Sequence, residues 1–263
     1  MARGSALWTV VTEAARKAAR ALRRDFGEVE QLQVSNKGPS DFVSAADVKT
    51  EKTLRTELQK ARPRFGFLME ESGEIPAEDG KHRWIIDPID GTTNFLHGIP
   101  HFAISIALEM EGEIIAGLVY NPIVEELFYA EKGKGAYLND RRLRVSARNR
   151  LSESVIATGI PFHGRPGHEP FLKQLGRVMN DVAGVRRMGT ASLDLAYVAA
   201  GRYEGFWETG LQPWDIAAGI LLVREAGGFV TDFKGDKNVI ASGNVVAANA
   251  KLHKQLLDLV VKG

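Results

Sequence analysis

The sequence of 263 residues contains no cysteine. That absence excludes disulfides, thiolate zinc sites and cysteine nucleophiles, so any bound metal must be held by oxygen atoms or by the six histidines. The formal net charge is only +1, which gives no general argument for binding to nucleic acid or to a membrane. No apolar run approaches the ~18 residues of a membrane span, and residues 1–26 lack the continuous apolar core of a secretory signal. We therefore expect a soluble, cytoplasmic protein.

The composition is that of an ordinary globular protein, with 44% hydrophobic and 25% charged residues. A chain of this length can form one large domain or two closely packed ones. Residues 1–150 have the pattern of two helices beside an antiparallel sheet, and residues 151–263 that of a smaller layer of alternating strands and helices. We expect a mixed α/β (α+β) fold in which residues 1–263 form a single catalytic unit, with its site between the two halves.

The most informative stretch begins with three apolar residues, Trp84 to Ile86, which predict a short buried strand. Pro88 predicts the end of that strand, because proline cannot donate to a sheet ladder. Asp87 and Asp90 then lie on a stiff loop, and a Gly-Thr-Thr-Asn turn follows in which Gly91 can bring its amide close to an anion. Carboxylates beside free amides suit a hard cation that itself holds a phosphate.

Acidic residues also adjoin other predicted elements. Glu70 follows an apolar strand at residues 65–69, and Asp215 precedes an apolar helix at residues 216–226. Sites in open α/β sheets form beyond the carboxyl ends of strands. Carboxylates gathered there repel one another, and oxygen-liganded Mg²⁺ or Mn²⁺ resolves the repulsion. Taken singly, each acid also fits a turn, a helix cap or an exposed strand end, so only their joint occurrence favours a metal site.

The rest of the sequence shows no internal repeat. Apolar residues recur at helical spacing within residues 1–26 and in residues 45–61. Residues 28–40 have the polar character of a loop, and strands with tight turns fill residues 102–145. The second half is predicted to contain helices at residues 171–182, 189–200, 216–226 and 250–261 and strands at residues 155–159, 185–188, 205–208, 229–231 and 245–248.

Four segments keep a distinctive order and spacing: residues 41–47 (DFVSAAD), 70–72 (EES), 87–95 (DPIDGTTNF) and 214–228 (WDIAAGILLVREAGG). Together they resemble the motifs of the inositol monophosphatase family, whose members are Mg²⁺-dependent, lithium-sensitive phosphatases. One departure is Met69, which stands where glycine is usual. The resemblance covers nearly the whole chain and implies a layered α-β-α-β-α sandwich of the inositol monophosphatase and fructose-1,6-bisphosphatase type, usually a homodimer.

The resemblance also implies which residues hold metal ions. A first ion would be bound by Glu70, Asp87 and the carbonyl of Ile89, and a second by Asp87, Asp90 and Asp215. Glu70 would help to hold a third, loosely bound ion. Two to three Mg²⁺ ions per site are therefore expected, with Mn²⁺ as a possible replacement and Li⁺ as an inhibitor.

Catalytic and substrate contacts follow from the same resemblance. Thr92, paired with Asp47, would orient and deprotonate the attacking water, and Glu70 would help to hold that water. The amides of Gly91 and Thr92 would hold phosphate oxygens. The complete set of expected substrate contacts is Asp90, Gly91, Thr92, Gly189, Thr190, Ala191, Glu208 and Asp215.

The motifs identify the substrate less specifically than they identify the superfamily. An inositol monophosphate is the first candidate, and histidinol phosphate, fructose 1,6-bisphosphate and a 3′-phosphoadenosine nucleotide are the alternatives. Glu208 favours a polyol, because an acid accepts hydroxyl donors and repels a second phosphate. Arg186 and Arg187 are adjacent on a predicted strand and should point to opposite faces. The sequence assigns no role to these arginines or to His163 and His168.

A different class of function is a regulatory protein that keeps the fold and contacts RNA or a transcription complex. Its support is the basic N-terminal helix and the run from Arg141 to Arg144. Both patterns are typical of a solvated face, and the complete set of acids favours an enzyme. We therefore expect a small-molecule phosphate ester as the partner, a homodimer, and no contact with a membrane or nucleic acid.

Overall fold

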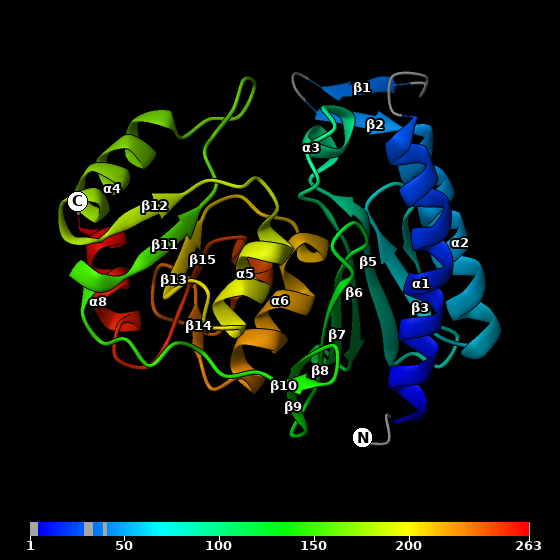
Figure 1. The fold of residues 1–263 in the computed structure, drawn as a ribbon. Helices are drawn as coiled ribbons and strands as arrows, with labels where there is room; N and C mark the ends of the chain where they lie inside the picture. Colours follow the sequence, from blue (N-terminus) through cyan, green and yellow to red (C-terminus); the bar gives the residue numbers. More distant parts are fainter. Residues whose placement is uncertain (1–4, 29–33, 39–40, 263) are drawn as a thin grey trace.

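The chain forms five alternating layers of helices and strands. The computed structural model describes residues 5–28, 34–38 and 41–262. The helices of these residues are α1 (Ala6–Gly27), α2 (Ala45–Ala61), α3 (Thr92–Leu96), α4 (His168–Asp181), α5 (Ala191–Ala199), α6 (Pro213–Glu225), α7 (Val239–Ser242) and α8 (His253–Val261). Figure 1 shows α1 and α2 outside the larger sheet, α5 and α6 between the two sheets, and α4 and α8 outside the smaller sheet. The expected α-β-α-β-α sandwich is confirmed.

The larger sheet belongs to the first half of the chain. Its strands are β3 (Gly66–Met69), β4 (Gly73–Ile75), β5 (His82–Asp90), β6 (Ala103–Met110), β7 (Glu113–Asn121), β8 (Glu126–Glu131), β9 (Gly135–Leu138) and β10 (Arg141–Arg142). They lie in the order β10-β9-β8-β7-β6-β5-β3-β4. The expectation of a purely antiparallel sheet is wrong at one pair, because β3 and β5 are parallel. That pair brings the carboxyl ends of both strands to the same edge.

The smaller sheet belongs to the second half. Its strands are β11 (Val155–Thr158), β12 (Gly184–Arg186), β13 (Gly205–Glu208), β14 (Phe229–Thr231) and β15 (Val245–Ala248), in the order β12-β11-β13-β15-β14. The strand β11 is parallel to both of its neighbours, whereas β15 is antiparallel to β13 and β14. A separate antiparallel pair in the first half joins β1 (Val34–Gly38) to β2 (Asp41–Ser44).

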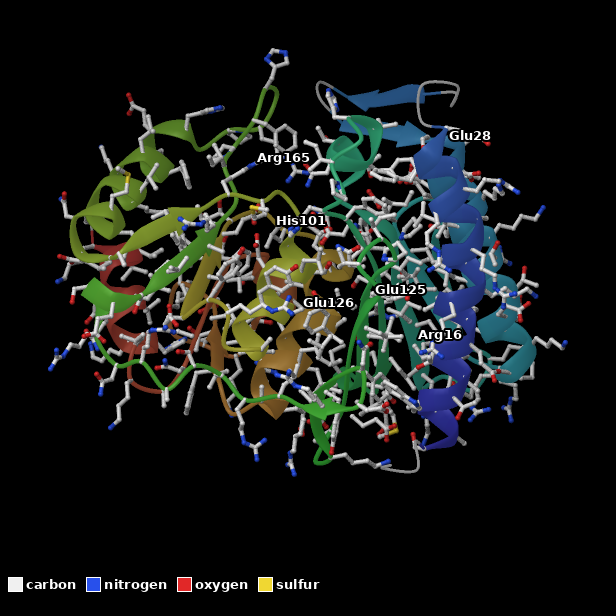
Figure 2. The ribbon with its side chains drawn as sticks, viewed as in Figure 1. Arg16, Glu28, His101, Glu125, Glu126 and Arg165 are labelled. Carbon is white, nitrogen blue, oxygen red and sulfur yellow. The ribbon has the colours of Figure 1, made fainter. Side chains whose placement is uncertain are left out.

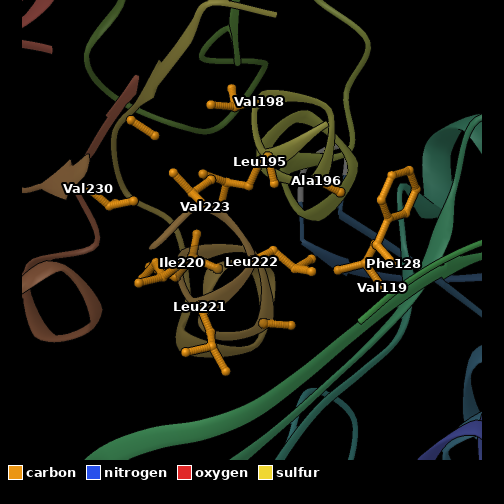
Figure 3. Close-up of a cluster of buried hydrophobic side chains, with 14 of the residues drawn as sticks. Val119, Phe128, Leu195, Ala196, Val198, Ile220, Leu221, Leu222, Val223 and Val230 are labelled. Atoms are coloured by element: carbon orange, nitrogen blue, oxygen red, sulfur yellow. The ribbon is translucent and has the colours of Figure 1, made fainter. Parts of the chain in front are cut away.

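The middle layer holds much of the core. Figure 3 shows apolar side chains of α5 and α6 packed against one another, with Val119 and Phe128 of the larger sheet beside them and Val230 on the opposite side. Both helices are apolar around most of their surface, as expected for helices covered by a sheet on each side. Because α6 is held in this layer, its first turn lies next to the edge of the larger sheet.

The strand that leads into the acidic stretch is longer than expected. It continues through Pro88 to Asp90, and its pairing with β6 changes register between Asp87 and Asp90. At such an irregularity proline need not donate to the ladder, which explains why it does not end the strand. The following residues form the helix α3 rather than a simple turn, with Gly91 at its N-cap in a left-handed conformation (φ 94°).

Other boundaries differ more modestly. The predicted loop at residues 28–40 is wrong where β1 forms, and its residues 29–33 and 39–40 lie outside the described residues. The sequence pattern also predicts a strand at residues 143–145, but the last strand of this sheet is β10 at Arg141–Arg142, and the amide of Val145 binds the carbonyl of Ala226 instead. The sequence did not predict β4, α7 or the 3₁₀ turn at Leu151–Glu153. None of the described helices has both the length and the apolar character needed to cross a membrane.

A glycine in β7 sets how closely α6 approaches the larger sheet. A Cβ atom on Gly117 would lie 2.9 Å from both the Cα and the carbonyl oxygen of Ala218 in α6. Backbone atoms cannot move aside as a flexible side chain can, so this position accepts no side chain without a shift of the helix. Gly176 in α4 is the opposite case, because a Cβ atom there would have no other atom within 4 Å.

Replacing these two glycines by alanine should change stability in opposite directions. Gly117→Ala should lower the free energy of unfolding by roughly 1–3 kcal/mol through overpacking. Gly176→Ala should raise it by about 0.5–1 kcal/mol, because alanine loses less backbone freedom in a helix. Urea unfolding followed by circular dichroism measures both variants. A Gly117→Ala protein as stable as the wild type would show that the contact between α6 and the sheet is not tight.

Candidate metal and phosphate site

Three aspartates from two distant elements converge at the edge where β3 and β5 end. One oxygen each of Asp87, Asp90 and Asp215 lie within 4.8 Å of one another. The first two come from β5, and Asp215 comes from the first turn of α6. Asp215 is therefore not the N-cap of α6. It lies inside the helix, and one of its oxygens accepts a hydrogen bond of 2.7 Å from the amide of Gln212.

Glu70 lies beside this cluster on the loop that joins β3 to β4. Its amide donates to the carbonyl of Ile86 over 3.2 Å, which ties the loop to the end of β5. The charge of Glu70 raises the pKa of Asp87 and of Asp90, after the larger effect of burial. The expected grouping of Glu70 with the aspartates is therefore present in the structure.

Burial dominates the protonation of the cluster. It raises the pKa of Asp90 to about 6, although hydrogen bonds from Ser192 oppose the rise. Burial and then the charge of Asp90 raise the pKa of Asp215 to about 7. The pKa of Asp87 lies well above its ordinary value because of burial and the charges of Glu70, Asp90 and Asp215. A cluster of this kind binds either protons or cations near neutral pH.

A hydroxyl and a carboxylate meet on one side of the cluster. The Oγ1 of Thr92 lies 3.1 Å from the Oδ1 of Asp47 and 3.0 Å from the carbonyl oxygen of Ile89. Asp47 is 1% exposed, and its Oδ2 accepts hydrogen bonds from the amide (2.8 Å) and the hydroxyl (2.6 Å) of Ser44. This capping box at the start of α2 fixes the carboxylate and leaves its other oxygen to Thr92.

One cavity collects the expected substrate contacts. Its volume is about 390 Å³. The lining includes all eight of them: Asp90, Gly91, Thr92, Gly189, Thr190, Ala191, Glu208 and Asp215. Asp87 and Ile89 are almost fully buried in β5, behind this lining. The structure thus brings the expected residues together, and their individual roles stay predictions.

Glu208, at the end of β13, forms part of the cavity wall. Burial, followed by the charges of Asp215 and Asp90, raises its pKa to about 8, and Arg187 and Arg165 oppose the rise. A Cβ atom on Gly159 would lie 1.9 Å from the Oε1 of Glu208, so a side chain at position 159 would displace this carboxyl group from its present place. Sequence reasoning missed Gly159, which the pattern marks only as the last residue of a predicted strand.

Two arginines belong to the cavity wall. Arg187 and Arg165 line it, and Figure 2 shows Arg165 on the loop that precedes α4. The guanidinium of Arg165 lies 4.6 Å from the ring centre of Phe162, which also lines the cavity. Arg186 is exposed, donates to the carbonyl of Val185 and is not part of the lining, so only one of the two adjacent arginines lines the cavity. His163 and His168 are exposed, and neither belongs to the cavity lining.

Hydrogen bonds join the two halves at the site. The Nδ2 of Asn94 donates to the carbonyl oxygens of His101 (2.7 Å) and Met188 (2.8 Å). The amide of Ser192 donates to the Oδ2 of Asp90 over 2.7 Å. Sequence reasoning missed both Asn94 and Ser192. Asn94 could have been noticed as a polar residue between Thr93 and the apolar Phe95, but no local pattern identifies an amide donor from a segment about a hundred residues away.

Comparisons with known proteins agree with this geometry. The family model described as "Inositol monophosphatase family" matches residues 5–262. The inositol-1-monophosphatase of Mesorhizobium japonicum is 60% identical, over 98% of this chain and 97% of its own. The crystal structure of the extragenic suppressor protein suhB from Bartonella henselae has a TM-score of 0.96 and 61% identity, over 98% of this chain and all of its own. The Nus factor SuhB of Escherichia coli K12 is 44% identical, over 94% of this chain and 93% of its own.

The raised pKa values predict how the stability of the metal-free protein depends on pH. Free carboxyl groups titrate near 4, whereas Asp90, Asp215 and Glu208 titrate at about 6, 7 and 8 in the folded chain. Between about pH 4 and these higher values, the three carboxyl groups therefore keep protons in the folded chain that they have lost in the unfolded chain. This contribution to stability is full below about pH 4 and is lost as the pH rises through about 6 to 8. Thermal melting in chelator from about pH 5 to about pH 9 should show that decline.

Added Mg²⁺ should reverse the decline, and the gain in melting temperature should grow with pH because the cation competes with protons. Asp90→Asn removes one titrating group, so its metal-free stability should fall less steeply between about pH 5 and pH 7. If the stability of the metal-free wild-type protein stays level or rises across this range, the raised pKa values of these carboxyl groups are contradicted.

Proposed function

Because this chain belongs to the inositol monophosphatase family, we propose that it is a phosphatase that hydrolyses inositol monophosphates to inositol and phosphate through a metal-activated water. The observation that carries the proposal is the position of the aspartate cluster. It opens onto a cavity that Glu208 borders, so an acidic cation site and a group for polyol hydroxyls share one space. A phosphate monoester of a polyol needs both.

The donor atoms of the cluster fit Mg²⁺. They are all oxygens, the sequence has no cysteine, and their raised pKa values show that a cation would relieve repulsion. Glu70, Asp87 and the Ile89 carbonyl would hold one ion and Asp87, Asp90 and Asp215 a second, with Glu70 assisting a third. When bound, Mg²⁺ neutralises phosphate charge and lowers the pKa of water. Mn²⁺ would fit the same donors.

The pair of Thr92 and Asp47 would handle the proton of the attacking water. The hydroxyl hydrogen of Thr92 can point to the Oδ1 of Asp47, 3.1 Å away, which leaves a lone pair of Oγ1 directed elsewhere. That lone pair would accept a hydrogen bond from water and orient it. Because Ser44 fixes the other oxygen of Asp47, the pair needs no rearrangement before reaction.

The remaining wall of the cavity would bind the two ends of the substrate. The amides of Gly91 and Thr92 would hold phosphate oxygens, and the left-handed Gly91 lets the backbone approach closely. Glu208 and the segment from Gly189 to Ala191 would contact the hydroxyls of inositol. With a pKa of about 8, Glu208 can donate or accept a hydrogen bond near neutral pH, which suits a hydroxyl group.

Several further properties belong to the same proposal. The resemblance of the motifs to the family implies a homodimer and inhibition by Li⁺, and we also propose a cytoplasmic location. We also propose that residues 1–150 and 151–263 act as one catalytic unit. The cavity lined from both halves and the bond from Ser192 to Asp90 support that arrangement.

A regulatory role on RNA or a transcription complex is a second candidate. It is favoured by the name of the Escherichia coli relative, Nus factor SuhB, and by the exposed Arg141 and Arg142. Binding of a single-stranded RNA that weakens linearly with the logarithm of salt concentration would support it. Absence of binding at about 50 mM salt would exclude contacts with the RNA backbone.

Asp90→Asn should abolish most turnover and leave the fold intact. The neutral amide removes a ligand charge, while its carbonyl oxygen can still accept the amide hydrogen of Ser192. We expect kcat to fall at least about 100-fold. Loss of a residue that only contacts a metal ligand costs up to about 100-fold, and loss of a ligand itself should cost no less. Asp181→Asn, at an exposed position in α4, is the matched control and should retain full activity. Near-normal turnover of Asp90→Asn at saturating Mg²⁺ would contradict the assigned role.

A small substrate panel tests the reaction itself. Phosphate release should be measured from inositol 1-phosphate, histidinol phosphate, fructose 1,6-bisphosphate and 3′-phosphoadenosine 5′-phosphate. We expect Mg²⁺-dependent release, fastest from inositol 1-phosphate and reduced by Li⁺. A preference for one of the other three esters would move the chain to a related phosphatase. No Mg²⁺-dependent release from any of the four would overturn the enzyme assignment.

A further inference from the structure

A buried glutamate on α2 contacts the loop that carries Glu70. Glu51 is 2% exposed, and its Oε2 accepts a hydrogen bond of 2.8 Å from the amide of Glu71. Its Oε1 accepts a hydrogen bond from the hydroxyl of Ser72. Within the described parts of the chain, no lysine or arginine forms an ion pair with Glu51. Burying a carboxyl group that only an amide and a hydroxyl contact costs free energy of folding. Charge pairing therefore does not explain why a glutamate occupies this position.

The loop that Glu51 holds is short. Met69 pairs with Gly73 across β3 and β4, so only residues 70–72 connect the strands. Gly73 takes a left-handed conformation (φ 73°), which closes the turn. At its start the loop is tied to β5 by the bond from the Glu70 amide to the Ile86 carbonyl. Glu51 accepts two hydrogen bonds from the rest of the loop, and these bonds help to fix the direction in which Glu70 leaves the strand.

The spacing on α2 connects this contact with the catalytic side of the site. Glu51 follows Asp47 by four residues, so both side chains lie on the same face of the helix, one turn apart. Asp47 binds Thr92, and Glu51 binds the 70–72 loop. One face of α2 therefore contacts both the start of α3 and the 70–72 loop, which border the aspartate cluster.

We propose that Glu51 is a positioning residue, which holds the 70–72 loop so that Glu70 faces Asp87. The proposal rests on the assignment of Glu70 as a metal ligand made above. Outer partners of metal ligands typically change metal affinity by about 10- to 100-fold when removed. The effect of Glu51 should therefore be seen in metal binding as well as in turnover.

The test compares three variants of Glu51 and its partner. Glu51→Ala removes both hydrogen bonds and should weaken Mn²⁺ binding, measured by calorimetry without substrate, by about 10-fold or more. Glu51→Gln can keep both contacts, because its carbonyl accepts from Glu71 and its amide donates to the Ser72 hydroxyl. It should bind Mn²⁺ within about threefold of wild type. Ser72→Ala removes one contact at an exposed position, so it should fold normally and show an intermediate loss.

Glu57→Ala is the matched control on the same helix. Glu57 pairs with Lys17 on the surface at 2.6 Å, so its removal should leave Mn²⁺ binding unchanged. The Mg²⁺ concentration for half-maximal phosphate release should follow the same order among the variants. Wild-type affinity in both Glu51→Ala and Ser72→Ala would overturn the proposal. A loss in Glu51→Gln as large as in Glu51→Ala would also overturn it, because charge rather than position would then be responsible.

The outcome is separable from that of the proposed reaction. If the wild-type protein releases no phosphate from any ester, the proposed function fails, yet the calorimetric comparison still tests Glu51. If the wild-type protein is active and all the variants bind Mn²⁺ equally, only the positioning role fails.

Discussion

The mutual repulsion of buried carboxylates is the constraint on which the rest of this structure depends. Asp87, Asp90 and Asp215 lie with oxygens within 4.8 Å of one another, and burial raises the pKa of each. Each also accepts a backbone amide, from Ile89, Ser192 and Gln212 respectively. These neutral donors orient the acids but do not cancel their charge. A bound cation would relieve the remaining repulsion near neutral pH, so the cluster suits the metal ion that we propose for it.

The layered fold is what brings the third acid to the first two. Asp215 is more than a hundred residues from Asp87, and it reaches the cluster because α6 lies in the middle layer against the larger sheet. Gly117 allows the backbone of α6 to approach β7, and a Cβ atom on Gly219 would lie 2.5 Å from the Cβ of Leu195 in α5. Small residues at both contacts set the depth of the helix between the sheets. The position of Asp215, a proposed metal ligand, therefore depends on the packing of core residues that take no part in the proposed reaction.

Much of the site could be predicted from the sequence because its residues lie in short local motifs. The segment around Asp87 and Asp90, the helix start at Asp47 and the acid after β3 each carry their own turn and cap signals, and the structure brings them together. Residues whose roles depend on a distant partner could not be found. Gly159 matters only because Glu208 packs against it, and Ser192 only because Asp90 lies beyond its amide. The end of β5 was missed because a register shift accommodates Pro88, which local propensity cannot reveal.

Polar residues that contact these local motifs hold the motifs together at one site. Asp47 and Glu51 lie one turn apart on α2 and bind Thr92 and the loop after Glu70, while Asn94 binds the segment before α5. Their partners are the first residue of α3 and two loop segments. A single rigid helix, α2, contacts both Thr92 and the 70–72 loop, so it can fix the two relative to each other. The regular spacing of α2 therefore supports the proposal that this helix positions the residues around the aspartate cluster.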